Sequence, residues 1–157
     1  MSETTYIGRY KILKELGRGA MSVVYQAEDP DIGRLLAIKL LKHDLIEKDE
    51  YRELFVSEAK SAGRLSHPSI VTIYDTGIWN GRPFIAMELL DGVTLDEYLF
   101  QKGTLDLDTL LKLATKLTEA LEYAHRQGVI HRDLKPDNIF VLDDGKHFKI
   151  TDFGIAK

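Results

Sequence analysis

Two short stretches of this chain carry side chains that could act on a phosphate ester. Residues 131–138 include Asp133 and Asn138, and Asp152 follows a little later. A carboxylate such as Asp133 can accept the proton of a hydroxyl group. The oxygens of Asn138 and Asp152 are ligands that hard metal ions such as Mg²⁺ prefer. Together these groups supply what the transfer of a phosphoryl group from Mg-ATP requires.

The same stretches match the signatures of a known family. They read His131-Arg132-Asp133-Leu134-Lys135-Pro136-Asp137-Asn138 and Asp152-Phe153-Gly154. They resemble the catalytic loop and the metal-binding loop of protein kinases, and Lys135 is typical of the serine/threonine branch. Residues 92–95 and 150–157 look most like the eukaryotic-like kinases of bacteria. The resemblance implies ATP and Mg²⁺ as ligands and a protein with a serine or threonine hydroxyl as substrate.

The resemblance also implies a role for each polar side chain. Asp133 would orient and deprotonate the substrate hydroxyl, and Lys135 would neutralise charge that grows on the transferred group. Asn138 and Asp152 would hold Mg²⁺. Small-molecule kinases of related fold are an alternative, but they usually lack the complete string from Arg132 to Pro136.

A glycine-rich turn is expected between two strands. Gly17, Gly19 and Ser22 lie in it, and Ser22 stands where the family pattern has a third glycine. A dinucleotide-binding loop should open a helix instead, so that interpretation fails. Glycines between strands allow backbone amides to approach phosphate oxygens, although an ordinary hairpin would also contain them.

Lys39 lies within an apolar strand, and a carboxylate on the next helix should accompany it. As a kinase residue it would contact the α- and β-phosphates of ATP and pair with Glu58. Glu53 is the alternative partner, with less suitable spacing. Without the resemblance, Lys39 would be read as an edge lysine whose ammonium reaches water.

The resemblance further implies an adenine site. Met87 would be the gatekeeper, and the Glu88 carbonyl and the Leu90 N–H would bond to the adenine edge. Four apolar residues would line the slot: Leu16, Val24, Ala37 and Phe140. Each of the four could equally be an ordinary core residue, since such a slot is continuous with the core.

Hydrophobic periodicity and turn residues predict the elements that must position these groups. Strands are expected at residues 10–16, 23–28, 35–41, 70–78, 83–88, 139–142 and 147–151. Helices are expected at residues 47–65 and 106–127, with a capping box at Thr94 and Glu97 that opens a short one. The expected class is α+β and protein-kinase-like: a five-stranded antiparallel N-lobe at residues 1–91 with one main helix, then a mostly helical C-lobe at residues 92–157.

The chain ends three residues after Gly154. We therefore expect a truncated C-lobe without the activation segment that follows in the family. The apolar arc of helix 106–127 spans about half of its circumference, which predicts neighbours on two sides. A partly bare helix would favour self-association, and a nucleotide-binding module without phosphotransfer is the alternative function.

Composition excludes several other classes. The 157 residues include no cysteine, so disulfides and thiolate metal sites are impossible. The histidines lack zinc-ligand spacing. A net charge of −4 disfavours nucleic-acid binding, and no apolar run approaches a membrane span. We expect a cytoplasmic protein.

Overall fold

The computed structural model describes residues 5–153 of the chain. They form two compact units. The first contains the chain up to Ala59 together with Ile73–Leu89, and the second contains Lys60–Thr72 and the chain from Leu90 onward. The lobe boundary expected after residue 91 stays a prediction.

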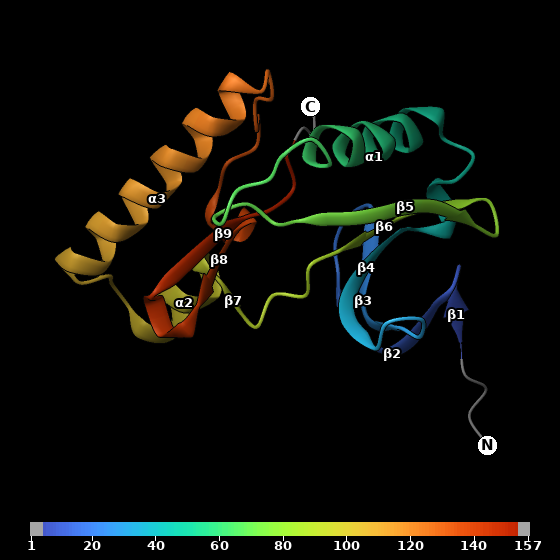
Figure 1. Cartoon of the computed structure of the whole chain (residues 1–157), viewed down its shortest axis with the longest axis horizontal. Helices are drawn as coiled ribbons and strands as arrows, with labels where there is room; N and C mark the ends of the chain where they lie inside the picture. Colours follow the sequence, from blue (N-terminus) through green and yellow to red (C-terminus); the bar gives the residue numbers. More distant parts are fainter. Residues whose placement is uncertain (1–4, 154–157) are drawn as a thin grey trace. The chain divides into compact units, whose positions relative to one another are not determined.

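An antiparallel sheet of six strands dominates the first unit (Figure 1). In the order of the sheet, the strands are β1 (Tyr6–Ile7), β2 (Tyr10–Arg18), β3 (Ser22–Asp29), β4 (Arg34–Leu41), β6 (Arg82–Met87) and β5 (Ile73–Trp79). The sheet has one strand more than the five expected, because the two residues of β1 pair with the edge of β2. So short a strand carries no periodicity that sequence reasoning could detect.

Strand β4 is buried on both faces, which explains its continuous apolar sequence. Leu36, Ile38 and Leu40 point into one hydrophobic cluster with Tyr10 and Phe84. The alternate residues face the other way, since side chains along a strand change sides at every step. Leu41 lies on this second face, in a cluster that helix α1 (Asp49–Ala62) covers.

Helix α1 (Asp49–Ala62) contributes Phe55 and Ala59 to this second cluster, which also contains Leu41, Leu45 and Ile85. A short 3-10 turn (His43–Leu45) leads from β4 toward α1. The helix is shorter than the expected 47–65. The backbone turns after its end, where the Leu65 amide bonds to the Ala62 carbonyl at 3.0 Å.

The second unit combines helices with a three-stranded sheet. Its strands are β7 (Gly92–Thr94), β8 (Ile139–Leu142) and β9 (His147–Ile150), in that order. Its helices are α2 (Leu95–Lys102) and α3 (Leu107–Arg126). Short 3-10 turns span Pro136–Asn138 and Asp143–Gly145. The capping box of Thr94 and Glu97 is confirmed at the start of α2.

The expected strand 70–78 is divided between the two units. Strand β5 begins only at Ile73. Ile70 instead forms a bridge with Ile150 of β9, and the Val71 amide donates to the Ile150 carbonyl at 3.0 Å. A contiguous apolar run cannot reveal which partner each half will choose, because pairing depends on the tertiary structure.

Helix α3 is covered on only part of its apolar arc. Leu113 packs with Ile139, Val141 and Phe148 of the small sheet. Leu107, Leu110 and Leu111 remain exposed at 68%, 48% and 56%. Among residues 5–153, no helix combines the length and hydrophobicity that crossing a membrane would require.

Candidate catalytic site

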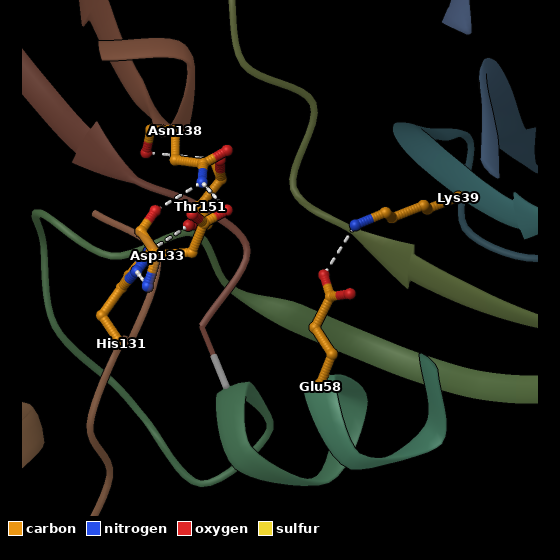
Figure 2. Close-up of polar contacts among 6 residues, drawn as sticks. All are labelled: Lys39, Glu58, His131, Asp133, Asn138 and Thr151. Atoms are coloured by element: carbon orange, nitrogen blue, oxygen red, sulfur yellow. Dashed lines mark hydrogen bonds and ion pairs between the residues drawn. The ribbon is translucent and has the colours of Figure 1, made fainter. Parts of the chain in front are cut away.

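Lys39 and Glu58 form a buried ion pair in the first unit (Figure 2). The Lys39 Nζ and the Glu58 Oε1 are 2.7 Å apart, and the two side chains are 10% and 8% exposed. Lys39 shares its face of β4 with Leu41, and α1 covers that face. The contact expected between Lys39 and Glu58 is therefore present, whereas the alternative partner Glu53 is exposed. Removing two charges from water is unfavourable unless they pair, so the contact constrains both side chains.

The glycine-rich turn connects β2 to β3. The Gly19 amide donates to the Ser22 carbonyl at 2.9 Å, and Ser22 pairs with Leu41 of β4. A Cβ added at Gly17 would meet no atom within 4 Å, and one at Gly19 would approach only the Ser22 carbonyl oxygen, at 3.8 Å. Neither residue has a positive φ. The fold itself thus does not require glycine at these two positions, so a purely structural hairpin does not explain them.

Some residues of the expected adenine site share one face of the sheet. Val24 pairs with Lys39, and Ala37 pairs with Met87, so these side chains point to the same side. Glu88 follows β6 directly, and Leu16 is 45% exposed on β2. These placements are compatible with a slot above the β3–β4–β6 face.

Two residues of the expected adenine site belong to the second unit. Phe140 lies on β8, where it pairs with Thr94 and Lys149, and Leu90 lies shortly before β7. The roles of all seven adenine-site residues stay predictions.

Asp133, Lys135 and Asn138 gather in the second unit. The Asn138 Nδ2 donates to the Asp133 backbone carbonyl at 2.8 Å and lies 3.5 Å from the Asp133 Oδ2. The Lys135 Nζ is 3.4 Å from the same carboxylate oxygen. Asn138 is buried, whereas the Asp133 side chain is 22% exposed. The loop therefore presents the Asp133 carboxylate, which Asn138 contacts and solvent can reach, beside the ammonium of Lys135.

His131 connects this loop to Thr151, the residue before Asp152 in the sequence (Figure 2). Its Nδ1 accepts a hydrogen bond from the Asp133 amide at 3.2 Å. The proton of the ring must then lie on Nε2, which donates to the Thr151 carbonyl at 2.7 Å. The ring also packs edge-on against Phe153, with centroids 4.7 Å apart. The sequence pattern alone did not indicate these hydrogen bonds of His131.

Thr151, the residue before Asp152, lies opposite Asn138 through backbone pairing. The Thr151 amide donates to the Asn138 carbonyl at 2.9 Å, continuing the antiparallel pairing of β8 with β9. Asp152 has a φ of 59° and Arg132 has a φ of 67°. Non-glycine residues rarely adopt such angles, and this strain concentrates at functional sites. Gly154 lies outside the described residues.

The donor set fits Mg²⁺. Because the Asn138 Nδ2 is directed at Asp133, the hard oxygen Oδ1 is the atom of this amide that suits a metal ion. Asp152 supplies a carboxylate. In the described part of the chain, no group of three or more histidine, cysteine or acidic side chains is arranged to hold a metal. Magnesium does not require such a group, because water and phosphate oxygens commonly complete its shell.

Comparison with known proteins identifies the family. The family model for the protein kinase domain matches residues 10–157. The chain belongs to the protein kinase family. The kinase fold expected from the sequence is confirmed by the crystal structure of the PknI kinase domain from Mycobacterium tuberculosis. That structure matches with a TM-score of 0.85 and 31% identity, over 100% of this chain and 64% of that one.

Two bacterial proteins are among the curated relatives of this kinase chain. The chain is 44% identical over 153 residues to the probable serine/threonine-protein kinase PknB of Lactococcus lactis, covering 97% of this chain and 24% of that protein. It is 42% identical over 149 residues to the serine/threonine-protein kinase PrkC of Bacillus subtilis, covering 95% and 23%. The chain thus spans about a quarter of the length of these relatives.

Proposed function

We propose that this kinase chain transfers the γ-phosphoryl group of ATP to a serine or threonine hydroxyl of a protein. The observation that carries the proposal is the contact of the Asn138 amide with Asp133, beside the ammonium of Lys135. It supports a base, a cation and a metal-binding oxygen acting on one reacting group. The sequence identity of this chain with relatives that are named serine/threonine-protein kinases also supports this reaction class.

In the proposed reaction, Asp133 accepts the proton of the substrate hydroxyl. The hydroxyl oxygen forms a new bond to the γ-phosphorus, and the bond from that phosphorus to the β–γ bridging oxygen breaks. The electron pair of the broken bond leaves with ADP. Lys135 stabilises the negative charge on the transferred group. A positioned base of this kind accelerates transfer by about 10²–10⁴-fold.

Asn138 and Asp152 would hold Mg²⁺, which when bound neutralises charge on the phosphates. The glycine-rich turn would bring the backbone amides of residues 17–22 to phosphate oxygens. The open space at Gly17 and Gly19 supports this role. Lys39, oriented by Glu58, would contact the α- and β-phosphates.

The adenine ring would be bound by the residues that the family resemblance implies. The Glu88 carbonyl and the Leu90 N–H would bond to its edge, and Met87 would be the gatekeeper, as in the family. The apolar faces of the ring would contact Leu16, Val24, Ala37 and Phe140. Because the reaction consumes ATP, the proposal includes a cytoplasmic site of action.

Self-association belongs to the proposal as well. The exposed leucines at the start of α3, Leu107, Leu110 and Leu111, form an apolar stripe on one helix. A second copy of the chain is the occupant that we propose for this stripe, since two such helices could bury it mutually.

A phosphotransfer assay tests the proposed reaction. The chain is incubated with Mg-ATP and a generic basic protein, and Asp133→Asn is compared with Asp137→Asn, an exposed neighbour. We expect Asp133→Asn to lose about 10²–10⁴-fold in turnover while Asp137→Asn retains it. Equal turnover of both variants would overturn the role of Asp133. A thermal shift with Mg-ATP but no transfer by the parent chain would instead indicate a nucleotide-binding module.

A further inference from the structure

The end of strand β4 lacks a normal hydrogen-bond partner on β6. The register of β4 with β6 pairs Lys39 with Ile85 and Leu40 with Phe84, so Pro83 lies opposite Leu41. Proline has no N–H group and cannot donate to the sheet. The carbonyl of the fully buried Leu41 therefore needs another donor, because an unpaired buried carbonyl is strongly unfavourable.

Arg82 supplies that donor. Its Nε donates to the Leu41 carbonyl at 2.7 Å. The guanidinium lies over the ring of Trp79, 5.8 Å from the ring centroid, across the tight turn at Asn80 and Gly81. Burial lowers the pKa of Arg82 from its ordinary value, while Tyr25 and Asp44 act in the opposite direction. The side chain is thus partly desolvated and held on two sides.

Leu41 contacts helix α1 and lies next to the glycine-rich turn, and both lie close to Lys39. It lies two residues after Lys39 on the same face of β4 and packs with Phe55 and Ala59 of α1. The next residue, Lys42, donates its amide to the carbonyl of Met21 in the glycine-rich turn at 2.9 Å. In Figure 1 the β5–β6 hairpin lies beside the segment that leads from β4 into α1.

We propose that Arg82 is a positioning residue for the Lys39–Glu58 ion pair. By holding the Leu41 carbonyl, it fixes the point from which the chain leaves the sheet toward α1, and it thereby sets where Glu58 meets Lys39. Neither Lys39 nor Glu58 is its hydrogen-bond partner in this contact, so its effect passes through the backbone. The consequence for catalysis rests on the proposed function, whereas the positioning itself does not.

Two measurements without nucleotide test the positioning. One is hydrogen exchange of the α1 amides. The other is the rate at which an amine-acylating reagent modifies Lys39, followed by mass spectrometry. The variants are Arg82→Met, which removes the donor, and Arg82→Lys, which retains a cation that can donate. Arg34→Met is the control, because Arg34 also lies over an aromatic ring, that of Tyr74, but at the opposite end of β4.

For Arg82→Met we expect α1 exchange and Lys39 acylation to accelerate by about tenfold, as for the loss of one hydrogen bond at a buried carbonyl. Arg82→Lys should restore most of the protection, and Arg34→Met should match the parent chain. If Arg82→Met does not fold, Arg82→Leu, which also lacks a donor, replaces it in the same comparison. Equal rates in the Arg82 and Arg34 variants would overturn the proposal. These readouts need no turnover, so failure of the kinase assay would leave them interpretable.

Discussion

The imidazole of His131 bonds to the carbonyl oxygen of Thr151 at 2.7 Å and thereby joins two segments that are distant in the sequence. The same ring accepts a hydrogen bond from the amide of Asp133. One buried side chain thus links the segment of the proposed base to the segment of the proposed metal ligand Asp152. Both bonds use the neutral ring, with its proton on Nε2.

Replacing His131 with phenylalanine should separate packing from hydrogen bonding. The ring contact with Phe153 can persist, but the Thr151 carbonyl and the Asp133 amide lose their partner. We expect a loss of about 1–3 kcal/mol in the free energy of unfolding, measured by chemical denaturation. His125→Phe, at an exposed position of α3, is the control. Unchanged stability of His131→Phe would contradict the role assigned to these bonds.

Replacing one member of the ion pair of Lys39 and Glu58 should destabilise the fold more than replacing both. Lys39→Met alone removes the cation that faces the buried Glu58 carboxylate, and such a loss costs about 3–5 kcal/mol in a buried pair. The double variant Lys39→Met/Glu58→Leu replaces both charges with apolar groups and should recover most of this stability. Denaturation curves of both variants and of the exposed control Glu53→Gln check the prediction. Equal stability of the single and double variants would show that the pair is not coupled.

Glycine replacements should distinguish the requirements of the fold from those of nucleotide binding. Gly19→Ala fits the local space, so we expect its stability to change by less than about 1 kcal/mol while Mg-ATP affinity falls. Gly33 has a φ of 63°, and Gly33→Ala should lose about 1 kcal/mol without a change in affinity. Calorimetric binding and denaturation of both variants provide the comparison. Unaltered affinity in Gly19→Ala would remove Gly19 from the phosphate site.

Protonation of His67 should destabilise the second unit. Its Nδ1 accepts the Ser69 amide at 3.0 Å, and its ring packs on Tyr123 with centroids 5.3 Å apart. Burial lowers the pKa of His67 below its ordinary value of 6.5, Lys116 and Lys149 act in the same direction, and Glu119 opposes them.

As the pH falls below 6.5, His67 therefore becomes protonated in the unfolded chain while it is still neutral in the folded chain. Stability from this group is complete above pH 6.5 and declines until the folded pKa is reached. Denaturation at a series of pH values should show a shallower slope in His67→Gln than in the exposed control His43→Gln. Parallel slopes would exclude His67 as the source.

The apolar stripe of α3 predicts concentration-dependent association. Leu111→Lys places a charge in the stripe and should shift sedimentation toward monomer. Glu119→Lys introduces a lysine at an exposed position on another side of the helix and should not. Monomeric behaviour of the parent chain at all concentrations would refute association through this helix.

The sequence predicted the site best where its functional groups lie in contiguous residues. Asp133, Lys135 and Asn138 gather because they lie within six consecutive residues of one loop, and the sequence alone predicted that group. The contact of Lys39 with Glu58 was also expected, because Glu58 matches the pairing position of the family that the chain resembles. The extra strand β1 and the division of residues 70–78 did not follow, because a strand chooses its partner through contacts that no local pattern contains.

The amino-acid sequence by itself determined which groups could bind a metal ion, accept a proton and approach phosphate, because residue type and close spacing carry that chemistry. Only the tertiary structure decided which backbone carbonyls the supporting side chains bond to. Arg82 reaches Leu41 across 41 positions of sequence, and His131 reaches Thr151 across 20. Such bonds exist because buried polar groups must find partners wherever the folded backbone brings them.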